Sequence, residues 1–258
     1  MGILNVTPDS FSDGGRHADV SAAIEAGLAM ADDGADIIDV GGESTRPGAA
    51  PVEPAAERAR IMPVVSALAA ASVRVSVDTR NATTMRAALD AGARVINDIS
   101  GLTHDPAASA VVAASGCSVV IMHMRGTPGT MNTLAVYSNV VAEVRAELRS
   151  RLDLAAAAGI SPHQIAVDPG IGFAKAAPQS VDLLRHLPGI APAEFPIVVG
   201  VSRKRFIGTL SGELDASRRL GGSLAAALFA LSRGASILRV HDVSATAQAV
   251  RVWHSLSK

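Results

Sequence analysis

Polar and charged side chains recur at the ends of short apolar runs along this chain. They comprise carboxylates, carboxamides, a histidine and cations, which are residue types that can bind a polar ligand or an anion. Partly buried polar groups without partners cost free energy, so a purely structural role does not explain so many of them. We interpret them as parts of one site. The segments are Asn5, residues 41–48, Asp78-Thr79-Arg80, Asn97-Asp98, Met122-His123, Asp168-Pro169-Gly170, Ser202-Arg203-Lys204 and Arg239-Val240-His241.

Arg239 and His241 stand two residues apart in an apolar run. On one strand, residues with this spacing point to the same side. The pair therefore predicts a clamp for an anion. The alternative interpretation is a surface ion pair between Arg239 and Asp242.

Taken singly, three of these residues have ordinary structural explanations. An Asp before Pro-Gly, as at Asp168, is more typical of a turn, because its side chain can accept from local amides. Lys204 can be a solvated helix start and Asn97 a cap at a strand end. The order and number of the motifs favour the functional interpretation of Asp168, whereas for Lys204 and Asn97 the residues alone leave both interpretations open.

Short runs rich in Val and Ile alternate with longer Ala-rich amphipathic stretches, as expected for parallel strands buried on both faces and covered by helices. Helices are expected at residues 22–31, 55–70, 82–91, 107–114, 139–158 and 222–233. The expected strands are residues 2–5, 37–40, 74–77, 95–97, 118–122, 165–167, 197–201 and 237–240.

The number of strands predicts an α/β fold, a single (β/α)₈ TIM barrel that spans residues 1–258 as one domain. An open doubly wound sheet fits less well, because no G-x-G-x-x-G follows the first strand. In such barrels the active site lies at the carboxyl ends of the strands. All the polar segments fall there.

The composition excludes several classes of protein. Hydrophobic residues make up 48% of the 258 residues and charged residues 18%, which is typical of a globular chain. A formal net charge of −1 provides no field for nucleic acid or an anionic membrane. Cys117, the single cysteine, rules out an internal disulfide framework. No secretory signal or membrane span is evident, so we expect a cytoplasmic protein.

The same segments carry a family resemblance. Residues 1–15, MGILNVTPDSFSDGG, resemble the opening signature of dihydropteroate synthases. The further matches follow in family order across nearly the whole chain. They are residues 42–48 (GESTRPG), 76–79 (SVDT), 95–98 (VIND), 168–173 (DPGIGF), 202–204 (SRK) and 239–243 (RVHDV).

The resemblance implies an enzyme, a transferase of alkyl or aryl groups other than methyl. It would condense (7,8-dihydropterin-6-yl)methyl diphosphate with 4-aminobenzoate to give 7,8-dihydropteroate and diphosphate in folate biosynthesis. The implied catalytic residues are Asp78, Asp168 and Lys204. Sulfonamides would compete with 4-aminobenzoate, and a homodimer through helices late in the barrel is implied.

The resemblance also assigns the substrate contacts. Asp168 would accept from the pterin amino and ring N–H groups, and Lys204 would donate to the carbonyl. Asn5 is the implied protein ligand of Mg²⁺, which also prefers phosphate oxygens and waters. The other implied substrate-binding residues are Asp78 and Asn97 for ring nitrogens, Met122 for an apolar wall, Arg239 and His241 for the diphosphate, and Phe11, Thr45, Arg46, Pro47 and Ser202 for 4-aminobenzoate.

Two features bear on the second substrate. Its carboxylate is expected near the amino end of a helix that begins around Ser202, where backbone amides favour an anion. Arg205 stands where many relatives have serine, so the response to sulfonamides is left open. The glycine-flanked loops after the first two strands are expected to close over the substrates.

The implied mechanism breaks the C–O bond before the amine attacks. Departing diphosphate would be stabilised by Mg²⁺, Arg239 and His241, and the methylene cation by Asp78 and Asp168. One alternative is a pterin-barrel methyltransferase acting on methyltetrahydrofolate, which has no use for a diphosphate clamp. Another is a noncatalytic pterin-binding paralogue, which would bind ligand without turnover.

Overall fold

The computed structural model describes residues 1–7, 16–46 and 48–257. Each predicted apolar run contains a strand, although the last two strands are shorter than expected. The strands are β1 (Gly2–Asn5), β2 (Ile38–Gly41), β3 (Val75–Asp78), β4 (Val95–Asp98), β5 (Ser118–Met122), β6 (Ile165–Asp168), β7 (Val198–Val199) and β8 (Ile237–Leu238).

The strands form a closed parallel barrel. One sheet has the order β1-β2-β3-β4-β5-β6, and β7 pairs with β8. Parallel bridges Val167↔Ile197 and Gly2↔Val240 join the two sheets. The Ile3 N–H donates to the Val240 carbonyl at 2.9 Å, which closes the ring between β8 and β1. The predicted (β/α)₈ barrel is confirmed.

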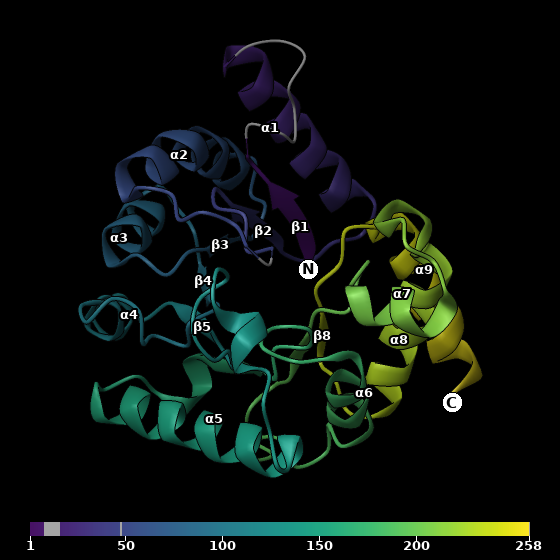
Figure 1. Cartoon of the computed structure of the whole chain (residues 1–258). Helices are drawn as coiled ribbons and strands as arrows, with labels where there is room; N and C mark the ends of the chain where they lie inside the picture. Colours follow the sequence, from purple (N-terminus) through teal and green to yellow (C-terminus); the bar gives the residue numbers. More distant parts are fainter. Residues whose placement is uncertain (8–15, 47, 258) are drawn as a thin grey trace.

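Helices surround the strands as a ring (Figure 1). Each predicted helix is present; α1 begins six residues before the predicted start, the other ends shift by at most two residues, and α6 and α9 lie outside the predicted segments. The helices are α1 (Arg16–Asp32), α2 (Pro54–Ala70), α3 (Ala82–Asp90), α4 (Ala108–Ser115), α5 (Val140–Ala157), α6 (Ala177–Arg185), α7 (Arg205–Ser211), α8 (Leu220–Ser232) and α9 (Val243–Leu256).

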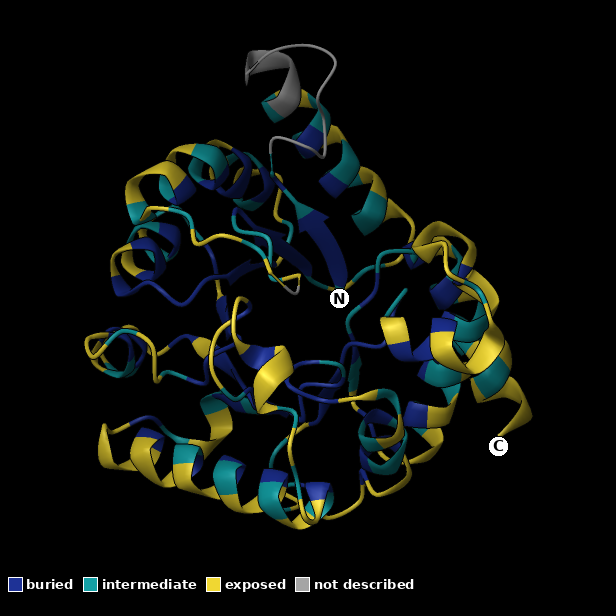
Figure 2. Cartoon of the chain, in the orientation of Figure 1, coloured by how far each residue is buried: buried dark blue, intermediate teal, exposed yellow. Residues whose placement is uncertain are grey.

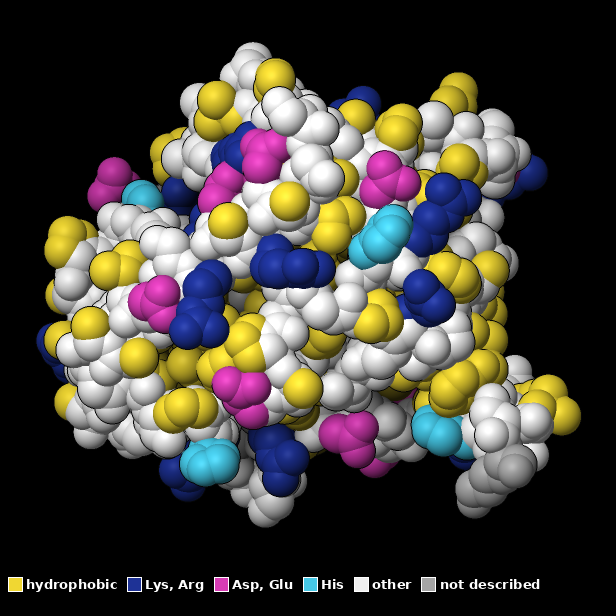
Figure 3. All heavy atoms as spheres, turned by 90° about the horizontal axis from the view of Figure 1, so that it is seen from below, with side chains coloured by type: hydrophobic (Ala, Val, Ile, Leu, Met, Phe, Trp, Pro, Cys, Tyr) yellow, Lys and Arg dark blue, Asp and Glu magenta, His cyan; other side chains and the backbone are white. Residues whose placement is uncertain are grey.

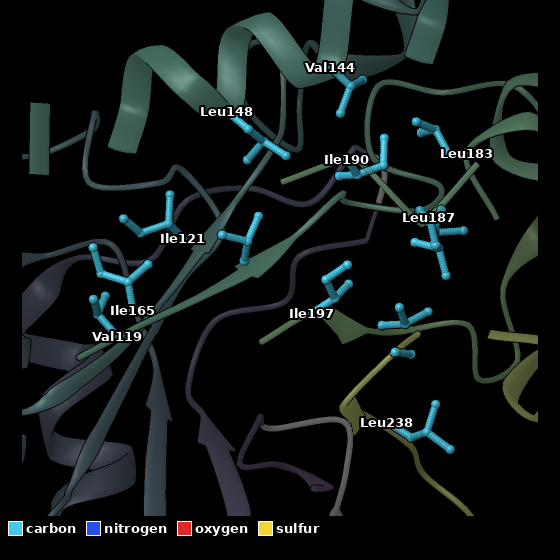
Figure 4. Packing of buried hydrophobic residues seen from close by; sticks show 14 of the residues in the cluster. Val119, Ile121, Val144, Leu148, Ile165, Leu183, Leu187, Ile190, Ile197 and Leu238 are labelled. Atoms are coloured by element: carbon cyan, nitrogen blue, oxygen red, sulfur yellow. The ribbon is translucent and has the colours of Figure 1, made fainter. Parts of the chain in front are cut away.

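The main core lies between the outer faces of the strands and the inner faces of the helices. Figure 2 shows strands that are buried and helices that are buried only on the side facing them. In Figure 4, Val144 and Leu148 of α5 point toward Ile121 of β5 and the loop residue Ile190. Each fully buried side chain of this kind stabilises the fold by about 1.5–3 kcal/mol.

The surface shows no preference for one sign of charge on the face drawn in Figure 3. Basic, acidic and apolar side chains are interspersed there. Among the described residues, no helix combines the length and the apolarity that a membrane span needs.

Candidate active site

The register of the parallel strands brings four predicted positions to one level of the barrel. Asn5 pairs with Gly41, Gly41 with Asp78, and Asp78 with Asn97. A Cβ atom on Gly41 would lie 3.5 Å from Asp78 Cβ and 4.0 Å from Asn5 Oδ1, so the side chains of Asn5 and Asp78 both border the space above Gly41. Met122 pairs with Asp168 on the opposite side of the barrel.

Arg239 lies inside the barrel between two buried carboxylates. Its Nε donates to Asp39 Oδ2 at 2.6 Å, and its Nη2 donates to Asp78 Oδ2 at 2.7 Å. Asp39 also accepts from Asn97 Nδ2 at 2.9 Å and from Ser76 Oγ at 2.6 Å. These contacts contradict the alternative pairing of Arg239 with Asp242.

Asp168 and Lys204 lie at the other side of the same rim. The Gly170 N–H donates to Asp168 Oδ1 at 2.6 Å, which closes a tight turn after β6. Lys204 Nζ donates to the Ile171 carbonyl and lies 4.5 Å from the centre of the Phe173 ring. Phe173 and Met122 belong to one small buried apolar cluster beside these groups, and the contact of Met122 with a pterin stays a prediction.

Gly200 leaves room for the Lys204 ammonium beside the base of the Arg239 side chain. A Cβ atom on Gly200 would lie 3.8 Å from Lys204 Nζ and 3.9 Å from Arg239 Cβ. Arg239 contacts Asp39 and Asp78 of β2 and β3, and Lys204 interacts with Asp168 of β6. The segments after β7 and β8 therefore connect the two groups of carboxylates. Sequence positions far apart form one polar interior at the carboxyl ends of the strands.

Ser202 orients His241. The His241 backbone N–H donates to Ser202 Oγ at 3.2 Å, and the ring Nδ1 lies 3.1 Å from the same oxygen. We assign the Ser202 O–H as the donor to Nδ1, since the hydroxyl can accept the backbone N–H and donate at the same time. This assignment places the ring proton on Nε2, which can then donate to an anion.

Burial controls the protonation of the carboxyl groups. It raises the pKa of Asp78 to about 7, against the effect of Arg239 and with a further contribution from Asp39. It also raises the pKa of Asp168, which Lys204 partly offsets. Both carboxyl groups therefore stay protonated to a higher pH than an exposed aspartate does.

Burial also affects the cations. It lowers the pKa of Lys204 to about 8, against the effect of Asp168. It lowers the pKa of His241 to about 4, with help from Arg203 and Arg239, so His241 is neutral at pH 7. For Arg239 burial lowers the pKa, but Asp39 and Asp78 raise it more, and the guanidinium stays charged.

The loop after β2 is anchored beside the site. Glu43 Oε1 accepts from Arg80 Nη2 at 2.8 Å and from the Val52 N–H at 3.3 Å, which ties both ends of the loop together. Thr45 is partly exposed and Arg46 exposed, and the charge of Arg46 contributes to the low pKa of His241. Two predicted substrate contacts, Phe11 and Pro47, lie outside the described residues.

The helix after β7 begins later than predicted. Helix α7 starts at Arg205, with Lys204 at its N-cap. The Arg205 side chain is exposed. Arg203 has a left-handed φ of 59°, and its guanidinium binds Asp242 with bonds of 3.0 and 2.6 Å. That ion pair and the bond from the Arg203 N–H to Ser223 Oγ hold the strained residue, which directs Lys204 inward.

The oxygen atoms at the rim fit a metal ion whose remaining ligands come from a phosphate group and water. Within the described ranges no group of three or more His, Cys, Asp or Glu side chains could hold a metal ion. The ligands available on either side of Gly41 are oxygen atoms, namely the carboxamide oxygen of Asn5 and the carboxylate of Asp78. Mg²⁺ tolerates so few protein ligands when phosphate oxygens and waters complete its shell.

Two features of the interior are missing from the sequence prediction. The first is Asp39, which is fully buried. A carboxylate inside the apolar run of residues 37–40 is the feature of the sequence that indicates it. The second is the set of partners of His123, which the sequence placed among the site segments: its Nδ1 lies 2.8 Å from Lys175 Nζ and its Nε2 lies 3.0 Å from Oε2 of the partly exposed Glu147. Burial lowers the pKa of both Lys175 and His123.

Comparisons with known proteins agree with this geometry. The profile of the family described as pterin binding enzyme matches residues 1–241. Dihydropteroate synthase of Mycobacterium leprae is 47% identical and aligns with 98% of this chain and 91% of its own length. That of Synechocystis is 46% identical over 99% of this chain and 89% of its own length.

Solved structures show the same relationship. Dihydropteroate synthase of Xanthomonas albilineans with 4-aminobenzoic acid has a TM-score of 0.94 and 47% identity, and the match covers 100% of this chain and 92% of that one. The same enzyme with 7,8-dihydropteroate has a TM-score of 0.90 and 44% identity, with the same coverage of both chains. The chain therefore belongs to the pterin-binding enzyme family and, within it, to the dihydropteroate synthases.

Proposed function

We propose that this chain condenses (7,8-dihydropterin-6-yl)methyl diphosphate with 4-aminobenzoate, forming 7,8-dihydropteroate and releasing diphosphate. The observation that carries the proposal is the pairing of buried carboxylates with two cations at one barrel rim. Arg239 contacts Asp78 at 2.7 Å, and Lys204 and Asp168 are close enough to shift each other's pKa. The matched synthases disfavour a methyltransferase.

Asp168, Asn97 and Lys204 recognise the pterin ring in this proposal. Asp168 accepts from the amino and ring N–H groups, and the Lys204 ammonium donates to the carbonyl oxygen. Met122 and Phe173 provide the apolar wall beside them. A flat ring with alternating donors and acceptors needs this combination of groups.

The diphosphate in this proposal binds between His241 and Arg239, whose charge helps to lower the pKa of His241. His241, neutral at pH 7, donates from Nε2, and Arg239 provides positive charge. Mg²⁺, held in part by the Asn5 carboxamide, would neutralise charge on the diphosphate. The basic residue Arg46 lies near enough to His241 to contribute to its low pKa and adds to this anion-binding region.

The charge of the interior favours a cationic intermediate. When all are ionised, the carboxylates Asp39, Asp78 and Asp168 exceed the cations Arg239 and Lys204 by one negative charge. This excess stabilises the pterin methylene cation that forms as the C–O bond breaks. The amine of 4-aminobenzoate is neutral at pH 7, attacks the cation and then releases a proton without a strong base.

The 4-aminobenzoate site includes Thr45, Arg46 and Ser202, with Phe11 and Pro47 completing it. Its carboxylate lies near the amino end of α7, where Arg205 is exposed. The related structures with 4-aminobenzoic acid and, from Yersinia pestis, with a sulfonamide drug support this substrate and sulfonamides as competitors.

Three further properties belong to the proposal. The chain acts as one domain over residues 1–258, in the cytoplasm, and as a homodimer. Several large apolar side chains exposed on or next to α7, α8 and α9 support the dimer; they are Leu210, Leu214, Leu220, Phe229, Val252 and Leu256.

The decisive experiment mixes the purified protein with the pterin methyl diphosphate and 4-aminobenzoate, with and without Mg²⁺. We expect dihydropteroate and diphosphate to form in equal amounts, and only with the metal ion present. A folded protein that binds the pterin but forms neither product would be a noncatalytic paralogue and would overturn the proposal.

A further inference from the structure

Asp39 lies one level below the predicted pterin contacts. On β2 it pairs with Ser76, whereas Gly41 pairs with Asp78, two residues further along both strands. With a rise of ~3.3 Å per residue, the carboxylate of Asp39 is rooted about 7 Å deeper in the barrel. Its exposed fraction is 0%. This depth gives it a supporting position beneath the rim.

From this position Asp39 contacts two residues of the rim at once. Asp39 Oδ2 accepts from both Asn97 Nδ2 at 2.9 Å and Arg239 Nε at 2.6 Å. Its other oxygen, Oδ1, accepts from Ser76 Oγ at 2.6 Å. TIM-barrel interiors are normally filled with branched apolar side chains at such levels. A charged group there needs an explanation beyond packing.

We propose that Asp39 is a positioning residue for pterin binding, which fixes the orientation of the Asn97 amide and the place of the Arg239 guanidinium. An ionised carboxylate only accepts hydrogen bonds, so the Asn97 side chain must direct Nδ2 toward it. Asn97 Oδ1 is then left to accept from an N–H of the ligand. This inference rests on the proposed function.

The same carboxylate determines how Arg239 is used. Arg239 is bonded through Nε to Asp39 and through Nη2 to Asp78, so the plane of its guanidinium is set by two fixed contacts. A planar, oriented guanidinium is suited to lie against a flat ring or an anion. Without Asp39, only the Asp78 contact remains among the described residues, and Arg239 can rotate about it.

Two substitutions, Asp39→Leu and Asp39→Asn, separate the positioning role of Asp39 from the effect of its negative charge. Leucine has a similar size but removes every acceptor. Asparagine can place its oxygen where Asp39 Oδ2 lies and turn its NH₂ group toward Ser76 Oγ, which can accept. Both contacts to Asn97 and Arg239 then survive while the negative charge is lost.

We expect Asp39→Leu to raise the pterin KM at least 30-fold. For Asp39→Asn we expect a pterin KM within about fivefold of the unchanged protein and a kcat reduced about tenfold, because one charge facing the methylene cation is lost. Rescue of the pterin KM by asparagine is the result that distinguishes positioning from a general defect.

The matched control is Glu57→Gln. Glu57 is also a fully buried carboxylate, and its Oε2 accepts from Asn81 and Thr84 and not from Asn97 or Arg239. We expect its kinetic constants to stay within about twofold of the unchanged protein. Circular dichroism and thermal melting of all variants identify any that fail to fold.

A double-mutant cycle with Asn97→Ala completes the test. Calorimetry with the pterin diphosphate measures how much Asp39→Leu weakens binding in the unchanged protein and in the Asn97→Ala protein. If Asp39 acts through Asn97, the loss of affinity is at least fivefold smaller in the Asn97→Ala protein. Additive effects, or a pterin KM unchanged in Asp39→Leu, would overturn the inference. Lack of turnover by the unchanged protein would instead count against the proposed function alone.

Discussion

Lys204 and Asp78 show how burial prepares individual side chains for their roles. Both groups lie inside the barrel, where the loss of water disfavours the charged form. The pKa of Lys204 falls to about 8 and that of Asp78 rises to about 7. The ammonium and the carboxylate are therefore both mainly ionised only between about pH 7 and about pH 8.

The pH dependence of kcat/KM for the pterin substrate should therefore be bell-shaped. We expect it to rise through about pH 7 as Asp78 ionises, and to fall above about pH 8 as Lys204 loses its proton. Lys204→Arg keeps its charge at high pH, so its alkaline limb should disappear. An alkaline limb that persists unchanged in this variant would contradict the assignment.

The pH dependence of the free energy of unfolding is a second test of the shifted pKa of Lys204. The pKa of Lys204 is lowered from 10.5 to about 8 in the folded protein. Between these values the unfolded chain binds more protons, so this group makes the free energy of unfolding rise with pH over that interval. Denaturant titrations at several pH values should show a smaller rise in the Lys204→Arg variant.

Asn5 and Asp168 should separate metal-dependent turnover from pterin recognition. Asn5→Ala removes the implied protein ligand of Mg²⁺, so we expect turnover to fall at least tenfold while pterin affinity changes less than threefold. Asp168→Asn should instead weaken pterin binding about 100-fold, because it replaces an acceptor with a donor. Calorimetry and steady-state kinetics at several Mg²⁺ concentrations measure both effects. Unchanged turnover and Mg²⁺ dependence in Asn5→Ala would refute its role.

At the scale of elements, the turn after β6 depends on close contact with β5. The His123 N–H donates to the Asp168 carbonyl at 2.9 Å. Gly170 has a φ of 67°, and a Cβ atom there would lie 1.9 Å from the His123 carbonyl oxygen. Only glycine allows the two backbones to approach this closely. The approach places Asp168 opposite Met122 at the rim.

Gly170→Ala should consequently disrupt the turn and the site together. We expect the free energy of unfolding to fall by at least about 3 kcal/mol, since the overlap requires backbone movement. Gly116→Ala is the control, because Gly116 has a similar φ of 68° and no atom within 4 Å of its Cβ position. Its cost should be about 1–2 kcal/mol. Equal costs by denaturant unfolding would contradict the role of the His123 contact.

For the whole molecule, the later helices are one region where large apolar side chains are exposed. Helices α8 and α9 pack against each other and lie beside α7 (Figure 1). Phe229 of α8 is 43% exposed and Val252 of α9 is 55% exposed. Apolar side chains gathered on neighbouring helices are typical of a protein interface. A second copy of this chain is the partner that we propose.

Phe229→Glu should weaken that dimer. In the dimer the charge would lie at an apolar contact, where it costs free energy, whereas in the single chain position 229 is partly exposed and the charge can reach water. Analytical ultracentrifugation should show a dimer for the unchanged protein and a dissociation constant at least tenfold higher for the variant. Leu134→Glu, with a similar exposure of 42% in the 3₁₀ turn Met131–Leu134 between β5 and α5, is the control. A monomeric unchanged protein would remove the basis of this prediction.

The sequence by itself determined the alternation of strands and helices and the segments that carry polar groups. These features depend on local periodicity and composition, which the chain displays directly. The barrel, its rim and the family are confirmed, and Asn5, Asp78 and Asn97 share the level expected of strand ends. Their contacts with ligands stay predictions.

Only the tertiary structure decided which polar groups pair with one another. Arg239 and Asp39 are 200 residues apart, yet their side chains meet at 2.6 Å. Spacing along one strand suggested that Arg239 acts with His241, whereas closure of β8 onto β1 and the register of β2 bring it to Asp39 and Asp78. Such pairs depend on strand register around the closed ring, which no local pattern in the sequence encodes.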